Sequence, residues 1–207
     1  MKKMSKKTIA IIVLAAIILA GALVAHFTAP SKPAEPAQKF TVPNRPADYS
    51  FGATTPKVTI VEFADFECPF CRDDYTAVRE ISYKYQKSVR VIFKDFPLHD
   101  TSLDLAMAAR CAGEQGFFWP MYDKLFALQD QFATTTLPDL AVSVGANKTI
   151  FANCFNSRKY LTAIRADYAD GQALGVSGTP TFFINGYKVV GEIPEANFEE
   201  IVQQFLK

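Results

Sequence analysis

The chain has 207 residues, with 22 Lys or Arg and 21 Asp or Glu, which gives a formal net charge of +1. Positive and negative residues are interspersed after the N-terminus, and no basic stripe stands out. The sequence therefore gives no indication of nucleic-acid binding, which requires concentrated positive charge.

The N-terminal segment, residues 1–27, has the pattern of a membrane anchor. Four lysines precede an uncharged run of eighteen residues, 8–25, which is long enough to cross a hydrocarbon core of about 30 Å. This run is longer than the apolar region of a cleaved signal peptide, and residues 23–25 match a cleavage site poorly. We expect an uncleaved anchor, with a cleaved signal as the alternative, and the lysines place the rest on the extracytoplasmic side, periplasmic or extracellular.

Residues 28–47 are expected to form a linker. The stretch 29–36 contains three prolines and no hydrophobic periodicity, which is typical of a semi-extended spacer. No second linker, charge block or repeat follows, so residues 48–207 are predicted to form one domain.

The two ends of this domain predict units of mixed structure. Residues 57–63 and 89–96 are predicted strands on either side of a helix at 69–86, which makes a β-α-β unit. Near the C-terminus, strands at Thr181–Ile184 and 188–190 flank Asn185-Gly186, a pair typical of a type I′ hairpin. Residues 194–206 carry apolar side chains at helical spacing and complete a β-β-α unit.

The region between the halves, about 100–176, is predicted to be an inserted all-helical subdomain, since a crossover needs only one helix. Residues 101–104 have the sequence of a capping box. Further helix starts are expected at four positions with start signals: Pro120, Pro138, Asn147 and Ser157. The fold class is therefore α/β with a helical insertion.

The motif Cys68-Pro69-Phe70-Cys71 lies directly after the first strand, where a helix is predicted to begin. As the N-cap, Cys68 would place its sulfur at the positive end of the helix dipole, which stabilises a thiolate. Cys71 lies inside the first turn, so Cys68 is the expected attacking thiol and Cys71 the resolving one. A zinc half-site is the alternative, but it needs a second pair of ligands, and His26 and His99 are the only histidines. No metal or other cofactor is expected.

The remaining cysteines, Cys111 and Cys154, are expected to form a structural disulfide, since an exported chain meets an oxidising compartment. Two alternatives are a pair of buried free thiols and a second redox pair. The second of these lacks the strand-to-helix setting that lowers a thiol pKa.

The two halves, the insertion and the dithiol together resemble the DsbA-like thiol:disulfide oxidoreductases of the thioredoxin superfamily, over roughly residues 48–207. The resemblance depends on the stretch 63–71, on Cys111 in the first inserted helix and on the stretch 176–182. It implies a thioredoxin-like fold in which Pro180 is cis and faces the dithiol, and in which Thr179 and Pro180 pair their backbone with the substrate. A proline that merely starts a strand is the alternative reading.

Glu62 lies within the first strand, six residues before Cys68. Burial beneath the dithiol would raise its pKa, and related enzymes keep a buried acid here, so Glu62 is expected to relay the proton of Cys71. Lys94 is considered as its ion partner. The alternative is that both side chains point to solvent on one face of the sheet.

Other residues near the motif have lesser expected roles. Asp65, Glu67 and Arg72 are expected to tune local charge, and His99 to be a solvated loop residue. An aromatic set is expected to belong to the core: Phe117, Phe118, Trp119 and Tyr122.

The sequence thus predicts a membrane-tethered, monomeric oxidase that passes disulfides to unfolded exported proteins and is reoxidised by a membrane partner of the DsbB or VKOR type. An isomerase or reductase using the same dithiol is an alternative, favoured by Thr179 but not by the short segment 28–47, which leaves no room for a dimerisation domain. A holdase or membrane-assembly factor with a purely structural Cys68–Cys71 bond is a third hypothesis.

Overall fold

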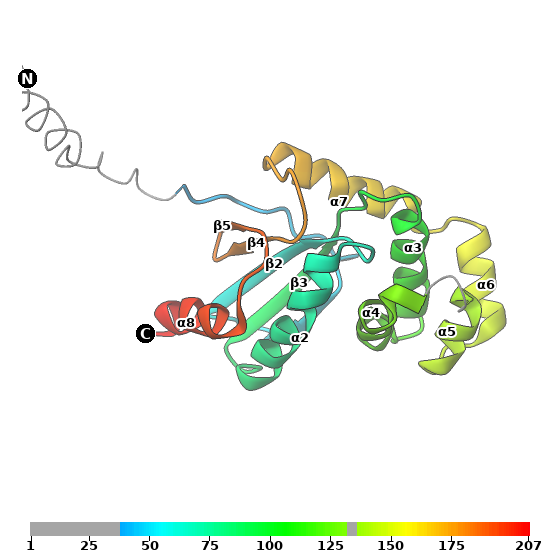
Figure 1. The fold of residues 1–207 in the computed structure, drawn as a ribbon, viewed down its shortest axis with the longest axis horizontal. Coiled ribbons are helices and arrows are strands. Elements are labelled where there is room, and N and C mark those ends of the chain that lie inside the picture. Colours follow the sequence, from blue (N-terminus) through cyan, green and yellow to red (C-terminus); the bar gives the residue numbers. More distant parts are fainter. Residues whose placement is uncertain (1–37, 132–135) are drawn as a thin grey trace, which may run out of the picture. The chain divides into compact units, whose positions relative to one another are not determined.

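The computed structural model describes residues 38–131 and 136–207 (Figure 1). The predicted anchor, 1–27, and the first part of the predicted linker lie outside the described residues. Within the described ranges, no helix combines the length and the apolar character needed to cross a bilayer.

A five-stranded sheet forms the centre of the domain, in the order β1-β3-β2-β4-β5. The central pair β2 and β3 is parallel, and all other neighbours are antiparallel. The strands are β1 (Ser50–Gly52), β2 (Val58–Ala64), β3 (Val89–Asp95), β4 (Thr181–Ile184) and β5 (Tyr187–Val190). All four predicted strands are confirmed within one residue at each end. The short edge strand β1 was not predicted.

Helices cover the two faces of the sheet, and the alternation of side chains along each strand decides what each helix meets. Val58 and Ile60 of β2 pack against α2 (Pro69–Lys84) and α8 (Glu195–Leu206). Val61 and Phe63 point to the other face, where α7 (Leu161–Ala173) contributes to the core. The central strands are therefore buried on both sides.

The inserted subdomain is all-helical, as predicted, and Figure 1 shows its helices gathered beside the sheet. Its elements are α3 (Ser102–Gly113), α4 (Phe118–Ala127), the short 3₁₀ turn η1 (Gln129–Gln131), α5 (Leu137–Ser143) and α6 (Lys148–Asn156). A disulfide between Cys111 and Cys154 joins α3 to α6, and both residues are buried. The structure thus forms the expected bond, so the alternative of two buried free thiols is wrong.

The structure differs from the expected helix starts in two details: the capping of α3, which does begin after Thr101, and the role of Ser157. Thr101 caps α3 without a side-chain bond, so the capping box is absent. The Glu67 carboxylate takes its place, because Oε2 accepts hydrogen bonds from the Thr101 N–H and the Ser102 hydroxyl, both at 2.9 Å. Ser157 ends α6 instead of starting a helix, and α7 begins at Leu161.

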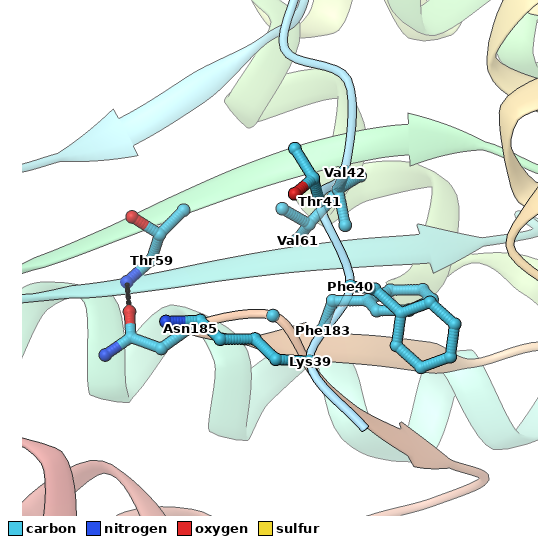
Figure 2. Close-up of a pocket in the computed structure, with 9 residues that line it drawn as sticks. Lys39, Phe40, Thr41, Val42, Thr59, Val61, Phe183 and Asn185 are labelled. Carbon is cyan, nitrogen blue, oxygen red and sulfur yellow. Dashed lines mark hydrogen bonds between the residues drawn. The ribbon is translucent and has the colours of Figure 1, made fainter. Parts of the chain in front are cut away.

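The part of the predicted linker that the structure describes packs on the domain. The Phe40 N–H donates to the Gly186 carbonyl at 2.8 Å. Figure 2 shows Phe40 beside Phe183 and Val42 beside Val61, and these side chains belong to one core cluster. The end of the predicted linker is therefore not a free spacer at Phe40 and Val42, which are partly buried against the sheet, while Pro43, Pro46 and Ala47 are exposed.

Candidate active site

Cys68 lies at the N-terminal end of α2. It adopts an extended backbone conformation with φ −73° and ψ 121°, and Pro69 opens the helix. Proline suits this first position of a helix, because its missing N–H is not needed there and its fixed φ is already helical. The Cys68 sulfur is 3.1 Å from the carbonyl oxygen of Thr179, and 5% of the residue is exposed.

The surroundings of Cys68 favour its thiolate. A hydrogen bond from the Cys71 thiol is the largest cause that lowers the pKa of Cys68, to about 5, and the backbone N–H groups of Phe70 and Cys71 act in the same direction. Burial opposes them. At neutral pH the reduced site therefore holds a Cys68 thiolate, which is the reactive form of a cysteine.

Cys71 has the opposite environment. Its thiol is free and wholly buried within the first turn of α2. Burial is the main cause that raises the pKa of Cys71 well above its usual value, and the neighbouring Cys68 adds to it. One thiol of the pair is thus prepared to react and the other to keep its proton.

The loop before β4 faces this pair. The Thr179–Pro180 peptide bond is cis, as the resemblance implied. The antiparallel register pairs Thr181 with Phe63, so the start of β4 lies next to the end of β2, from which the dithiol loop leaves. This pairing brings Thr179 to the Cys68 sulfur.

Glu62 is wholly buried, as predicted, and its charge is one of the causes that raise the pKa of Cys71. The Tyr122 hydroxyl of α4 donates to Oε2 of Glu62 at 3.2 Å. Desolvation is the main cause that raises the pKa of Glu62 to about 8, while the Tyr122 hydrogen bond and, to a smaller extent, the Arg79 charge act in the opposite direction. The carboxyl group therefore keeps its proton at neutral pH.

Lys94 is not the partner of Glu62, and the proposed ion pair is wrong. The parallel register places Lys94 opposite Phe63, so its side chain lies on the other face of the sheet. There its ammonium group donates to Asp48 at 2.6 Å and to Asp167 at 3.1 Å. The solvent-facing alternative is wrong as well, since Glu62 and Lys94 are both buried.

His99 is also not simply solvated, because its ring contacts the buried Asp65. Nδ1 of His99 lies 2.7 Å from Oδ2 of Asp65, and this hydrogen bond is the main cause that raises the pKa of His99. The same carboxylate oxygen accepts the Leu98 N–H at 2.7 Å, and the Asp65 carbonyl accepts the Cys68 N–H at 3.0 Å. Asp65 thus fixes the dithiol loop as well as contributing charge.

The remaining flanking residues agree in part with expectation. Arg72 forms an ion pair with Asp73 at 3.6 Å. Phe118 and Tyr122 are buried in the core, whereas Phe117 and Trp119 pack against it partly exposed. Phe70, between the cysteines, is 56% exposed.

Two residues near the site were missed. Gln129 of η1 donates hydrogen bonds to the carbonyls of Phe66 and Cys68. Asp74 is buried on α2 and accepts the Ile193 N–H at 3.1 Å, and desolvation is the main cause that raises the pKa of Asp74 to about 7. The sequence contained a signal for the burial of Asp74, because this residue falls among the inward positions of an amphipathic helix. Gln129 had none, as it is 61 residues from Cys68.

A hollow of about 300 Å³ lies elsewhere on the sheet, between residues 39–42 and the strands β2 and β4. Figure 2 shows it bordered by Thr59, whose N–H donates to the Asn185 side chain at 2.9 Å. Thr59 is near the start of β2, whereas the dithiol follows its end. The hollow is therefore separate from the redox pair.

Comparison with known proteins gives relatives of two kinds. A sodium/proton antiporter, NhaA 3 of Salinispora tropica, is 39% identical over 142 residues, which are 67% of this chain and 22% of the antiporter. The chain thus spans about a fifth of the length of this relative. Among solved structures, BdbD of Bacillus subtilis matches with a TM-score of 0.69 and 21% identity, covering 83% of this chain and 97% of BdbD.

A second solved structure, α-DsbA1 of Wolbachia pipientis, matches with a TM-score of 0.69 and 23% identity, covering 78% of this chain and 92% of that one. These likenesses show the fold. The family model described as thioredoxin matches residues 44–204, which is more than half of the chain. The protein therefore belongs to the thioredoxin family and has the fold of its DsbA-like members.

Proposed function

We propose that the chain is a thiol–disulfide oxidoreductase that introduces disulfide bonds into exported proteins through Cys68 and Cys71. The observation that carries the proposal is the contrast within the pair: the pKa of Cys68 is lowered to about 5, whereas the pKa of Cys71 is raised. A reduced form stabilised as a thiolate makes the disulfide of the same protein a better oxidant.

The reaction begins with the Cys68–Cys71 disulfide. A substrate thiolate attacks the Cys68 sulfur, the bond to Cys71 breaks, and Cys71 leaves as a thiolate that takes up a proton. A second substrate thiolate then attacks the substrate sulfur of the mixed disulfide and releases the Cys68 thiolate. The substrate dithiol is oxidised by two electrons and the enzyme disulfide is reduced by two.

Glu62 is the proposed source of the proton that Cys71 takes up. Its pKa of about 8 means that it carries a proton at neutral pH, and it interacts electrostatically with Cys71. The Tyr122 hydroxyl holds the carboxyl group in place from the helical insertion. Thr179 and Pro180 are proposed to bind the substrate backbone, because the Thr179 carbonyl lies against the Cys68 sulfur.

The location and partners follow from the N-terminal sequence and the chemistry. We propose that residues 8–25 anchor the chain in the membrane with the domain on the extracytoplasmic side. Unfolded exported proteins would be the substrates, and the reduced dithiol would be reoxidised by a membrane partner of the DsbB or VKOR type. The domain is proposed to act as a monomer.

The test uses the oxidised full-length chain in detergent and a reduced, unfolded protein whose folding requires disulfides. The proposal predicts stoichiometric transfer of disulfides to the substrate and loss of transfer in Cys68→Ser. A chain that fails to oxidise this substrate but rearranges scrambled disulfides would be an isomerase instead. Retention of a protective effect on the unfolded protein in Cys68→Ser, without transfer, would favour the holdase hypothesis.

A further inference from the structure

Gln129 belongs to the helical insertion, but its side chain contacts the loop that carries the redox motif. Its Nε2 atom donates to the Phe66 carbonyl at 2.8 Å and to the Cys68 carbonyl at 3.0 Å. Both partners are carbonyl oxygens, which only accept hydrogen bonds, so the NH₂ group of the amide must face them.

Both carbonyls belong to a buried loop, where a backbone acceptor is stabilised by a hydrogen-bond donor. Phe66 is 1% exposed and Cys68 is 5% exposed. A buried backbone carbonyl that loses its donor destabilises the fold, so the loop would rearrange at Phe66 if the amide were removed. The Cys68 carbonyl also accepts the Arg72 N–H at 3.1 Å, which is the first bond of α2. The Gln129 contact is therefore made at the peptide unit where the helix begins.

Other contacts hold the same loop from different sides. The Asp65 carbonyl accepts the Cys68 N–H, and the Glu67 carboxylate accepts from the first residues of α3. The segment of α4 and η1 reaches the site twice, since Tyr122 contacts Glu62 and Gln129 contacts Cys68. Of these contacts, the one from Gln129 acts on the carbonyl of the nucleophile itself.

We propose that Gln129 is a positioning residue that fixes the backbone of Cys68, so that its sulfur stays within reach of the Phe70 and Cys71 donors that stabilise the thiolate. The helical insertion thereby contributes to the reactivity of the dithiol. This inference rests on the proposed redox function and adds a residue outside the motif that sets its strength.

The experiment measures the pH dependence of iodoacetamide reaction at Cys68 in the reduced full-length chain, read by mass spectrometry. Gln129→Leu is expected to raise the pKa of Cys68 by about one unit, which corresponds to a tenfold weaker stabilisation of the thiolate. The reduction potential of the pair should become more negative by about 30 mV for that tenfold change. Gln129→Glu should give a larger rise, because its carboxylate lacks the donor and also repels the thiolate.

Gln115→Leu is the matched control. Gln115 is another glutamine of the insertion whose side chain bonds to the backbone: its Oε1 atom accepts a hydrogen bond from the Asn147 N–H at 2.8 Å. The Gln115→Leu substitution should lower the unfolding midpoint and leave the pKa of Cys68 unchanged. An equal shift in Gln115→Leu would overturn the proposal, because general loosening of the insertion would then explain it.

The proposal is also overturned if both Gln129 variants leave the pKa of Cys68 unchanged while that of the unmodified chain is low. If the pKa of Cys68 in the unmodified chain is about 8.5, as in a free cysteine, both the proposed redox function and the proposed role of Gln129 fail. The two failures are therefore distinguishable in one set of titrations.

Discussion

The chain contains two pairs of cysteines whose settings are opposite. Cys68 and Cys71 lie at the start of one helix as free thiols, one with a lowered pKa and one with a raised pKa. Cys111 and Cys154 lie within two different helices, 43 residues apart, and are bonded to each other. The difference shows that the position of a cysteine relative to a helix N-terminus, more than its burial, separates a reactive pair from a structural one.

The largest effect is expected when one thiol of the reactive pair is removed, which tests the roles assigned to Cys68 and Cys71. Cys68→Ser should abolish disulfide transfer, since the hydroxyl oxygen cannot form the mixed disulfide. Cys71→Ser also cannot form the starting disulfide, but its Cys68 thiolate should attack the disulfide of an oxidised substrate and stay in a mixed disulfide, because the Cys71 thiol that would release it is absent. Gel analysis under non-reducing conditions distinguishes the two, and trapping by Cys68→Ser would contradict the assigned roles.

Removal of the structural pair should affect stability alone. Cys111→Ala with Cys154→Ala is expected to lower the free energy of unfolding by about 2 to 5 kcal/mol, because the bond no longer restricts the unfolded chain. Denaturant unfolding measures this loss. The pKa of Cys68 should stay where it was, and a shift in it would mean that the two pairs are not independent.

Glu62, which lies near the reactive pair, makes the free energy of unfolding depend on pH. Its folded pKa is about 8, above its usual value of 4.5, so the folded state keeps a proton that the unfolded state has lost. Between these values the unfolded state binds fewer protons, and stability falls with rising pH by about 1.4 kcal/mol per unit from this group. Glu62→Gln should remove that part of the slope.

The measurement for Glu62→Gln is urea unfolding at several pH values between 5 and 8, compared with the unmodified chain. Asp74 and Asp167 also have raised pKa values, at about 7 and about 6, and contribute a slope of the same sign to both proteins. The difference between the two curves therefore isolates Glu62. Parallel curves would contradict its burial as a protonated acid.

The sequence was sufficient for features that depend on local spacing. The dithiol at a helix start, the central strands and the Asn185-Gly186 turn are each set by residues close together in the chain, and both turn residues have positive φ values in the structure. The cis bond at Pro180 came from the resemblance, since proline alone also fits the start of a strand.

Features that depend on register or on distant segments were not predictable. Whether Lys94 faces Glu62 is decided by the pairing of β2 with β3, where a shift of one residue reverses every side chain. The edge strand β1 has only three residues, too few for a periodic signal. The Gln129 contact and the Glu67 cap of α3 likewise join segments that only the folded chain brings together.

The most direct test of the account is the equilibrium reduction potential of the Cys68–Cys71 pair in the full-length chain, titrated against glutathione, with Cys68→Ser as the control. The lowered pKa of Cys68 predicts an oxidising pair, with a potential above about −180 mV. A potential near about −270 mV, like that of thioredoxin, would contradict the account and indicate a reductive role.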